Sequence, residues 1–230
     1  MKRFLKISAF ILLGLVVLSG ILFLIYNEPL PDGTPGPEAE AMAQKMLRTL
    51  NNTNFQKTKT IEWQVFEHHY SWNKADNKAS VKWKDNEVIL DLTNYSESVV
   101  FVDGIKKHTE PREELIKTAV EYYNNDSFWL VAPFKIYDPG TIRGIVNTDD
   151  GKKGLLVTYT TGGSTPGDSY LWFLNEDGFP TNFKMWVSII PLGGVNATWE
   201  DWKFTESGIY LPQKHKLSFF DFSISNIDTN

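Results

Sequence analysis

From about residue 58 onward, the chain alternates apolar and polar residues in short segments that end at turn-forming residues. Segments of this kind, rich in Val, Ile, Trp and Phe, are typical of β-strands. Connections such as Asp103-Gly104 are too short for a parallel crossover, which needs a dozen or more residues, so the segments must pair antiparallel. The spacing predicts strands over residues 60–70, 79–84, 87–93, 96–102, 141–147, 154–160, 169–174, 179–190, 196–204, 208–211 and 215–222.

Two amphipathic segments interrupt this pattern. In residues 38–50, Ala39, Met42, Ala43 and Met46 recur at helical spacing and give one apolar stripe. Residues 109–125 follow the same period, with Thr109 as the expected N-cap. Helix, meander, helix and longer meander together predict an α+β domain built on one large antiparallel sheet.

The segment that follows the second helix, residues 126–140, reads DSFWLVAPFKIYDPG. It fits neither the helical nor the strand period, and the sequence predicts an irregular apolar segment between helix and sheet. Its position, at the end of a helix that covers the sheet, favours a wall or lid rather than a catalytic centre.

The N-terminus combines a basic stretch with residues 7–26, which carry no charge over 20 positions. Twenty helical residues cross a hydrocarbon core of roughly 30 Å. The apolar run continues beyond Ser19-Gly20, so the pattern favours an uncleaved signal anchor over a cleaved signal peptide. The positive-inside rule predicts a single-pass inner (cytoplasmic) membrane protein whose C-terminal domain faces the periplasm, or the extracytoplasmic side.

Residues 27–37, NEPLPDGTPGP, hold four prolines and two glycines and predict an extended spacer. The expected organisation is therefore a membrane anchor over residues 1–26, a linker over residues 27–37, and an extracytoplasmic α+β domain over residues 38–230.

Charge and cysteine content exclude several classes of function. Without Lys2, Arg3 and Lys6, 20 basic residues remain against 28 acidic ones, and this acidic body is poorly suited to nucleic-acid binding. The chain has no cysteine, which excludes disulfides, a thiol nucleophile and zinc-thiolate sites. No cofactor is expected, and the sequence does not indicate an oligomeric state.

Catalytic and metal-binding patterns are weak. His68 and His69 would point to opposite faces of a strand, and no metal-binding histidine spacing occurs. In the loop over residues 160–168, the serine lacks the second glycine of a nucleophile elbow. We therefore expect no metal site and no catalytic residue. An alternative is a hydrolase that uses two of the carboxylates Asp126, Asp138 and Asp168.

Aromatic residues make up 14% of the chain and include eight tryptophans. Segments such as residues 170–174 and 183–187 place apolar groups on both faces of a strand, so both faces need to be covered. An ordinary aromatic core explains this as well as a ligand cleft does.

Residues 126–140 and 155–178, the latter with the run TPGDSYLWFLNEDG, resemble envelope proteins of Bacteroidota-type bacteria that are similar in form to the LolA-like superfamily. The resemblance covers about residues 115–202. It implies an unclosed half-barrel whose concave face is covered by helices and whose relatives hold acyl chains.

On this basis we expect a non-enzymatic, membrane-anchored domain that binds a lipid, an acyl chain or a lipidated protein partner. The expected wall of the apolar cleft is Phe128, Trp129, Leu130, Phe134, Trp172 and Trp186. An envelope scaffold that docks a protein partner is the main alternative.

Overall fold

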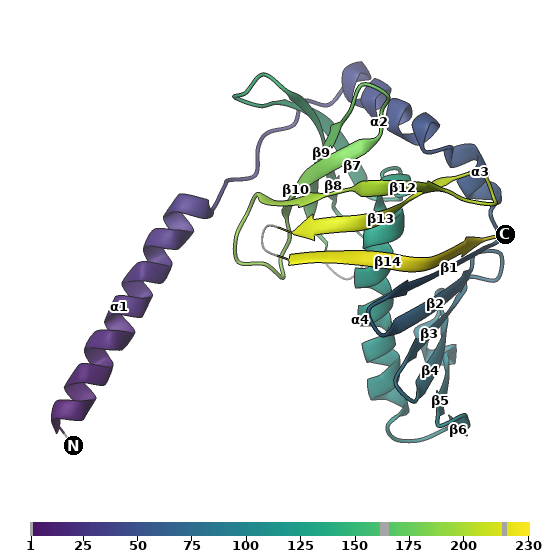
Figure 1. The fold of residues 1–230 in the computed structure, drawn as a ribbon, viewed down its shortest axis with the longest axis horizontal. Helices are drawn as coiled ribbons and strands as arrows, with labels where there is room; N and C mark the ends of the chain where they lie inside the picture. The colour runs from purple at the N-terminus through teal and green to yellow at the C-terminus, as the bar shows by residue number, and fades with distance from the viewer. Residues whose placement is uncertain (1, 162–165, 218–219) are drawn as a thin grey trace.

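The structure is a computed structural model that describes residues 2–161, 166–217 and 220–230; the side chains of residues 2–7, 9, 16 and 19 lie outside this description. Within the described residues, 14 strands form one antiparallel sheet that does not close into a barrel (Figure 1). The expected α+β class and large open sheet are confirmed.

The sheet runs in the order β6-β5-β4-β3-β2-β1-β14-β13-β11-β10-β9-β8-β7, and β12 pairs with β13. The first group of strands is β1 (Thr60–Val65), β2 (His68–Asn73), β3 (Lys78–Trp83), β4 (Asn86–Asp91), β5 (Val99–Val102) and β6 (Ile105–Lys107). The second is β7 (Thr141–Asn147), β8 (Lys153–Tyr159), β9 (Ser169–Leu174), β10 (Pro180–Trp186), β11 (Val195–Thr198), β12 (Glu200–Phe204), β13 (Tyr210–Leu217) and β14 (Phe220–Thr229).

The α-helices of the described chain are α1 (Lys2–Tyr26), α2 (Pro37–Thr49), α3 (Asn52–Lys57) and α4 (Arg112–Val131), with short 3₁₀ turns η1 (Tyr95–Glu97) and η2 (Ala132–Phe134). Helix α4 lies in the hollow of the curved sheet and contacts β3, β4, β5 and β13 (Figure 1). Helix α2 packs against β7, β8 and η2.

Helix α4 extends six residues further than the sequence predicts and includes the first part of the apolar segment 126–140. The expectation of irregular structure is wrong for residues 126–131. Helix α4 lies inside a curved sheet, so its last turns are apolar on several sides and lack the single stripe by which a surface helix is recognised. Pro133 then belongs to η2, beyond the end of the α-helix.

Apolar side chains occupy both faces of the β7–β10 region. The inner face belongs to the main core, with Trp172 and Phe183 fully buried under α4. A second, smaller cluster on the outer face consists of Val146, Leu156 and Leu171, with Phe173 and Trp186 packed against it. The prediction of two apolar faces is therefore confirmed.

Residues 27–36 are extended, as expected, but they lie against the body rather than free of it. Gly33 approaches Gly144 and Leu156 so closely that an added Cβ would contact both. Thr34 then forms an isolated antiparallel bridge with Ile145 on β7, at the edge of the sheet. We call residues 27–36 the strap, because they run over the outer face and around this edge before α2 begins.

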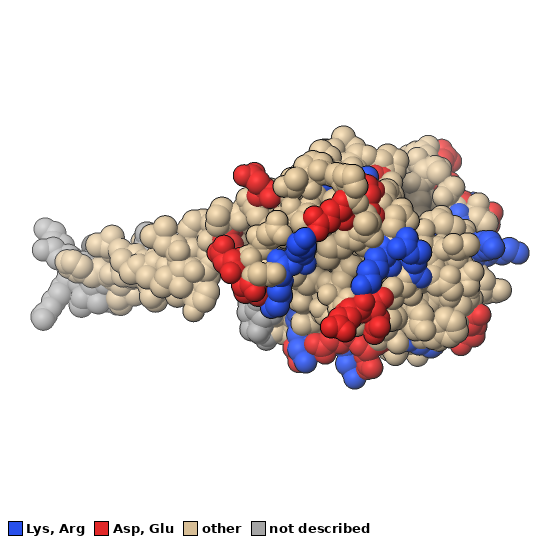
Figure 2. All heavy atoms as spheres, turned by 90° about the horizontal axis from the view of Figure 1, so that it is seen from above, with Lys and Arg blue, Asp and Glu red and all other residues tan. Residues whose placement is uncertain are grey.

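Helix α1 projects from the body (Figure 1). Its residues 7–26 include no charged residue, and the described part of the helix is tan in Figure 2. Its side chains from Phe10 to Tyr26 are mostly exposed. Judged on the described residues alone, no helix combines the length and hydropathy needed to cross a membrane. Lys2, Arg3 and Lys6, on which the expected orientation depends, have side chains outside the description.

Candidate functional site

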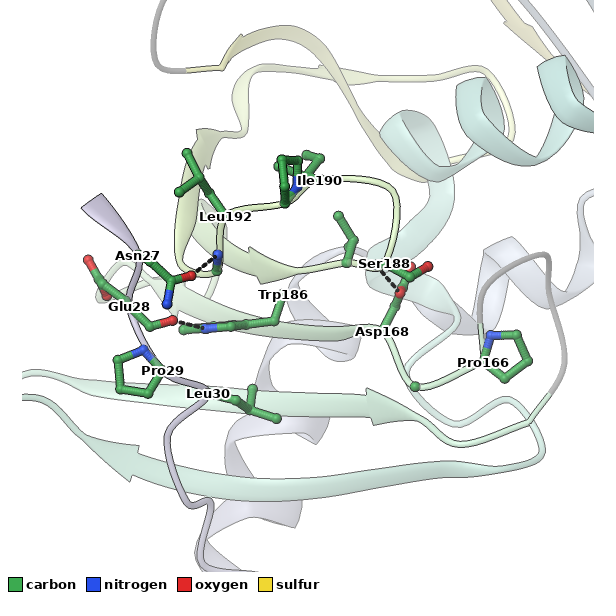
Figure 3. A pocket seen from close by; sticks show the side chains of 14 residues that line it. Asn27, Glu28, Pro29, Leu30, Pro166, Asp168, Trp186, Ser188, Ile190 and Leu192 are labelled. Atoms are coloured by element: carbon green, nitrogen blue, oxygen red, sulfur yellow. Dashed lines mark hydrogen bonds between the residues drawn. The ribbon is translucent and has the colours of Figure 1, made fainter. Parts of the chain in front are cut away.

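The strap is fixed to the body where α1 ends. The Asn27 side-chain oxygen accepts the Gly193 N–H at 2.8 Å, and the Glu28 N–H donates to the Gly193 carbonyl at 3.0 Å. The Trp186 indole Nε1 donates to the Glu28 carbonyl at 2.8 Å, and Lys184 Nζ lies 2.6 Å from the Glu28 carboxylate. Figure 3 shows Asn27, Glu28 and Trp186 meeting at this junction.

A pocket of about 520 Å³ opens beside this junction. This volume lies within the range of small-molecule sites. The pocket is bounded by the start of the strap, by residues 166–168 between β8 and β9, and by residues 186–193 at and beyond the end of β10 (Figure 3). The apolar part of its lining is Pro29, Leu30, Pro166, Trp186, Val187, Ile190, Pro191 and Leu192.

The polar part of the lining centres on Asp168, which is buried and accepts the Ser188 backbone N–H at 3.0 Å. Burial raises the pKa of the neighbouring Tyr170, and the Asp168 carboxylate adds to this shift. Of the described lining residues, only Glu28 and Asp168 are ionisable, and none is a histidine. The lining therefore combines apolar side chains with several polar groups, a combination that suits an amphiphile.

The six predicted cleft residues do not line one cleft in this structure. Leu130 and Trp172 are fully buried, and Phe134 is buried as well, stacked on Phe55. Phe128 and Trp129 are partly buried on α4 and pack against the same inner core. Only Trp186 lines the pocket, because residues 172 and 186 occupy opposite faces of the sheet.

The pocket could not be predicted from the sequence, because it is formed by residues 27–30 and by residues 166–193, which lie far apart in the chain. A spacer rich in proline and glycine normally indicates a flexible link, and nothing in residues 27–30 marks them as a docking segment. The one feature of the sequence that could have indicated the pocket is the apolar run at residues 186–192. Most of this run was included in the predicted strand over residues 179–190.

The three carboxylates of the alternative hydrolase hypothesis each contact a different set of groups. Asp126 Oδ2 lies 2.9 Å from His68 Nδ1 and accepts the Tyr70 hydroxyl at 2.5 Å. Asp138 is 3.3 Å from Lys135 Nζ, and Asp168 bonds Ser188. Within the described parts of the chain, no cluster of three or more His, Asp or Glu residues is suited to a metal ion.

Of the two neighbouring histidines, His68 faces the inside and His69 is exposed, so their side chains point to opposite faces as predicted. His69 lines a second hollow, of about 680 Å³, on the outer face of β1–β4. Its polar groups are already paired: Ser71 donates to Glu62, and Lys82 lies 3.2 Å from Glu87. Residues 162–165, which include Ser164 of the glycine-rich loop, lie outside the described residues.

No family model matches the chain, and no curated protein matches it in sequence. Among solved structures, it is similar to a DUF1329 family protein from Desulfovibrio piger, with a TM-score of 0.40 and 10% sequence identity, over 84% of this chain and 93% of that chain. A likeness this distant assigns neither family nor activity, so the resemblance to the LolA-like superfamily stays a prediction.

Proposed function

We propose that this protein is a non-catalytic, membrane-anchored domain that binds a lipid-like amphiphile in the pocket between the strap and residues 186–193. Helix α1 is the proposed single-pass anchor in the inner membrane, with the body on the extracytoplasmic side. The basic residues ahead of an uncharged run of 20 positions favour this orientation.

One observation carries the proposal: Gly193 donates a hydrogen bond to Asn27 and accepts one from Glu28, and these bonds fix the pocket directly beside the end of α1. If α1 lies in a bilayer, the pocket opens at the lipid surface, where an acyl chain or headgroup reaches it over a short path. The lining supports this ligand class, since apolar side chains surround a few polar groups.

A second location deserves a test, because buried polar atoms within the main core lack partners in the described chain. The indole N–H groups of Trp63, Trp72, Trp172 and Trp199 make no hydrogen bond there. A buried donor without a partner is costly, and an ester or carboxylate oxygen of an inserted ligand would satisfy it. This alternative keeps the ligand class and moves the ligand under α4.

The test is native mass spectrometry of the full chain, extracted from its membrane in mild detergent. We expect one lipid adduct per chain. Leu30→Glu places a charge in the pocket and should abolish the adduct, whereas Ile142→Glu on β7 should retain it. Both side chains are about half exposed, at 47% and 55%, so both variants should fold. A wild-type chain without lipid, or equal adducts in both variants, would contradict the proposal.

A further inference from the structure

Three phenylalanines form an aromatic cluster at one end of the sheet. Phe66 lies in the β1–β2 turn, and Phe220 and Phe222 lie at the start of β14. The ring centroid of Phe66 is 5.9 Å from that of Phe220 and 5.8 Å from that of Phe222. Phe66 and Phe220 are nevertheless 59% and 46% exposed, so the cluster presents apolar surface to its surroundings.

The backbone at Phe66 makes this exposure unusual. Phe66 has a φ of +49°, in the left-handed region that disfavours residues with a bulky side chain. The β3–β4 and β5–β6 hairpins turn through Lys84-Asp85 and Asp103-Gly104, whose first residues have φ values of +49° and +52°. Those turns place polar side chains at the same strained position. A phenylalanine at this position carries more backbone strain than asparagine or glycine would, and its ring is nevertheless 59% exposed.

Strand register places this cluster at the same end of the sheet as residues 187–194. Val65 pairs with Ile224, so the β1–β2 turn lies beside the start of β14. On the next strands, Leu217 pairs with both Phe220 and Ala197. The loop between β10 and β11 therefore leaves the sheet at this end as well.

That loop carries Ile189, which is 72% exposed, and Gly193, which is hydrogen-bonded to Asn27 and Glu28, the two residues that follow α1. The apolar rim, defined as Phe66, Ile189 and Phe220, thus shares one end of the sheet with the point where α1 leaves the body. A bilayer that receives α1 would lie next to this end.

The charges beside the rim narrow the kind of partner. Glu67 follows Phe66 and Asp221 follows Phe220, and both are exposed. Acidic groups at these positions disfavour attraction to anionic headgroups. Contact at the rim would therefore depend on apolar burial and would not require anionic lipid.

We propose that the apolar rim inserts into the interfacial layer of the bilayer that holds α1, so that the body stands on the membrane in a fixed orientation. This inference rests on the membrane association in the proposed function. It adds a second contact that holds the pocket mouth against the lipid.

Since the chain has no cysteine, a single introduced cysteine is a unique labelling site. Phe66→Cys, Ile189→Cys and Phe204→Cys full chains are spin-labelled and reconstituted in zwitterionic phosphatidylcholine vesicles, and label depth is measured with apolar and water-soluble relaxing agents. Labels at positions 66 and 189 should lie roughly 5–10 Å below the headgroup boundary. Phe204 is the matched control: it is also 59% exposed, but its strand β12 leads to the turn near α3, and its label should remain in water.

Flotation of the same vesicles separates the two proposals. A chain that floats while the labels at positions 66 and 189 remain in water would overturn the rim contact and leave the anchor standing. A chain that does not float would overturn both. Protection at position 66 that rises with the protein-to-lipid ratio would show a second protein copy as the occupant, and would also overturn the inference.

A second variant tests the rim contact with a substitution that should not disturb folding. Phe66→Gly removes the ring and suits the left-handed backbone, so the fold should be retained. In a chain labelled at position 189, Phe66→Gly should move the label toward water. An unchanged depth at position 189 would contradict a shared contact of the rim with lipid.

Discussion

The indole Nε1 of Trp186 donates a 2.8 Å hydrogen bond to the backbone carbonyl of Glu28. This bond connects the outer face of β10 to a residue two positions beyond α1. It has a direct consequence for the organisation of the chain, because the segment expected to be a free spacer is part of the folded body. Both residues of this bond also line the pocket.

A substitution that crowds Gly194 should show how much the strap contributes to the stability of the body. An added Cβ at Gly194 would lie 2.6 Å from the Glu28 side chain, whereas nothing lies within 4 Å of one at Gly151. The two glycines have nearly equal φ values, +76° and +78°, so both alanine variants carry the same backbone strain. We expect Gly194→Ala to lose about 1–3 kcal/mol more in the free energy of unfolding than Gly151→Ala. Urea titration in mild detergent, with limited proteolysis of residues 27–36, measures this; equal losses would show that the strap does not stabilise the body.

The buried contact between α4 and β2 should depend on Asp126. Asp126→Ala leaves His68 and the Tyr70 hydroxyl without their shared acceptor, and we expect a loss of about 2–4 kcal/mol in unfolding free energy. Asp138→Ala breaks only an exposed pair with Lys135 and should cost less than about 1 kcal/mol. Similar losses in the two variants would mean that the Asp126 contacts do not hold α4 against the sheet.

Acid should destabilise the fold through His215. Burial lowers the pKa of His215 from 6.5 to about 4, so between these values the unfolded chain binds the proton and the folded chain does not. The free energy of unfolding should therefore fall as the pH drops from 6.5 to 4, by up to roughly 3 kcal/mol. His215→Gln should flatten this slope, while His108→Gln, at an exposed histidine, should keep it. If the slopes of all three proteins coincide, His215 is not the titrating group.

The β1–β2 turn should be less stable with Phe66 than with glycine at the same position. Glycine carries no steric penalty at a φ of +49°, so Phe66→Gly should raise the unfolding free energy by up to about 1 kcal/mol. The same substitution at Phe204, within β12, should lower it by roughly 0.5–1 kcal/mol. Thermal unfolding of both variants tests this comparison. A destabilised Phe66→Gly would mean that the aromatic cluster stabilises the fold and is not held at a cost to it.

Local patterns predicted the fold class, most strands and the core of α2. Residues 38–50 show one apolar stripe because α2 has one buried face, and the structure buries Ala39, Ala43 and Met46 along it. The antiparallel arrangement followed from short connections alone. These features depend on interactions between residues close in the sequence. Hydrophobic periodicity and turn-forming residues indicate such interactions directly.

Features that depend on distant contacts were missed. Residues 60–70 were predicted as one strand because Phe66 is not a turn former, although the chain reverses there. Strand β14 extends to Thr229, but its polar C-terminal half gave no strand signal; pairing with β1 stabilises it. Trp172 and Trp186 were assigned to one cleft because sequence spacing could not show which face of the sheet a helix or the strap would cover.

Photo-crosslinking tests the central claim most directly. A phospholipid with a diazirine on its acyl chain is mixed with the full chain in vesicles, irradiated, and the adducts are mapped by peptide mass spectrometry. We expect adducts on α1 and on residues 27–30 and 186–193. The adducts on residues 27–30 and 186–193 should disappear in Leu30→Glu and persist in Ile142→Glu. Adducts confined to α1, or concentrated on residues 128–134 and Trp172 under α4, would contradict a lipid site at the strap.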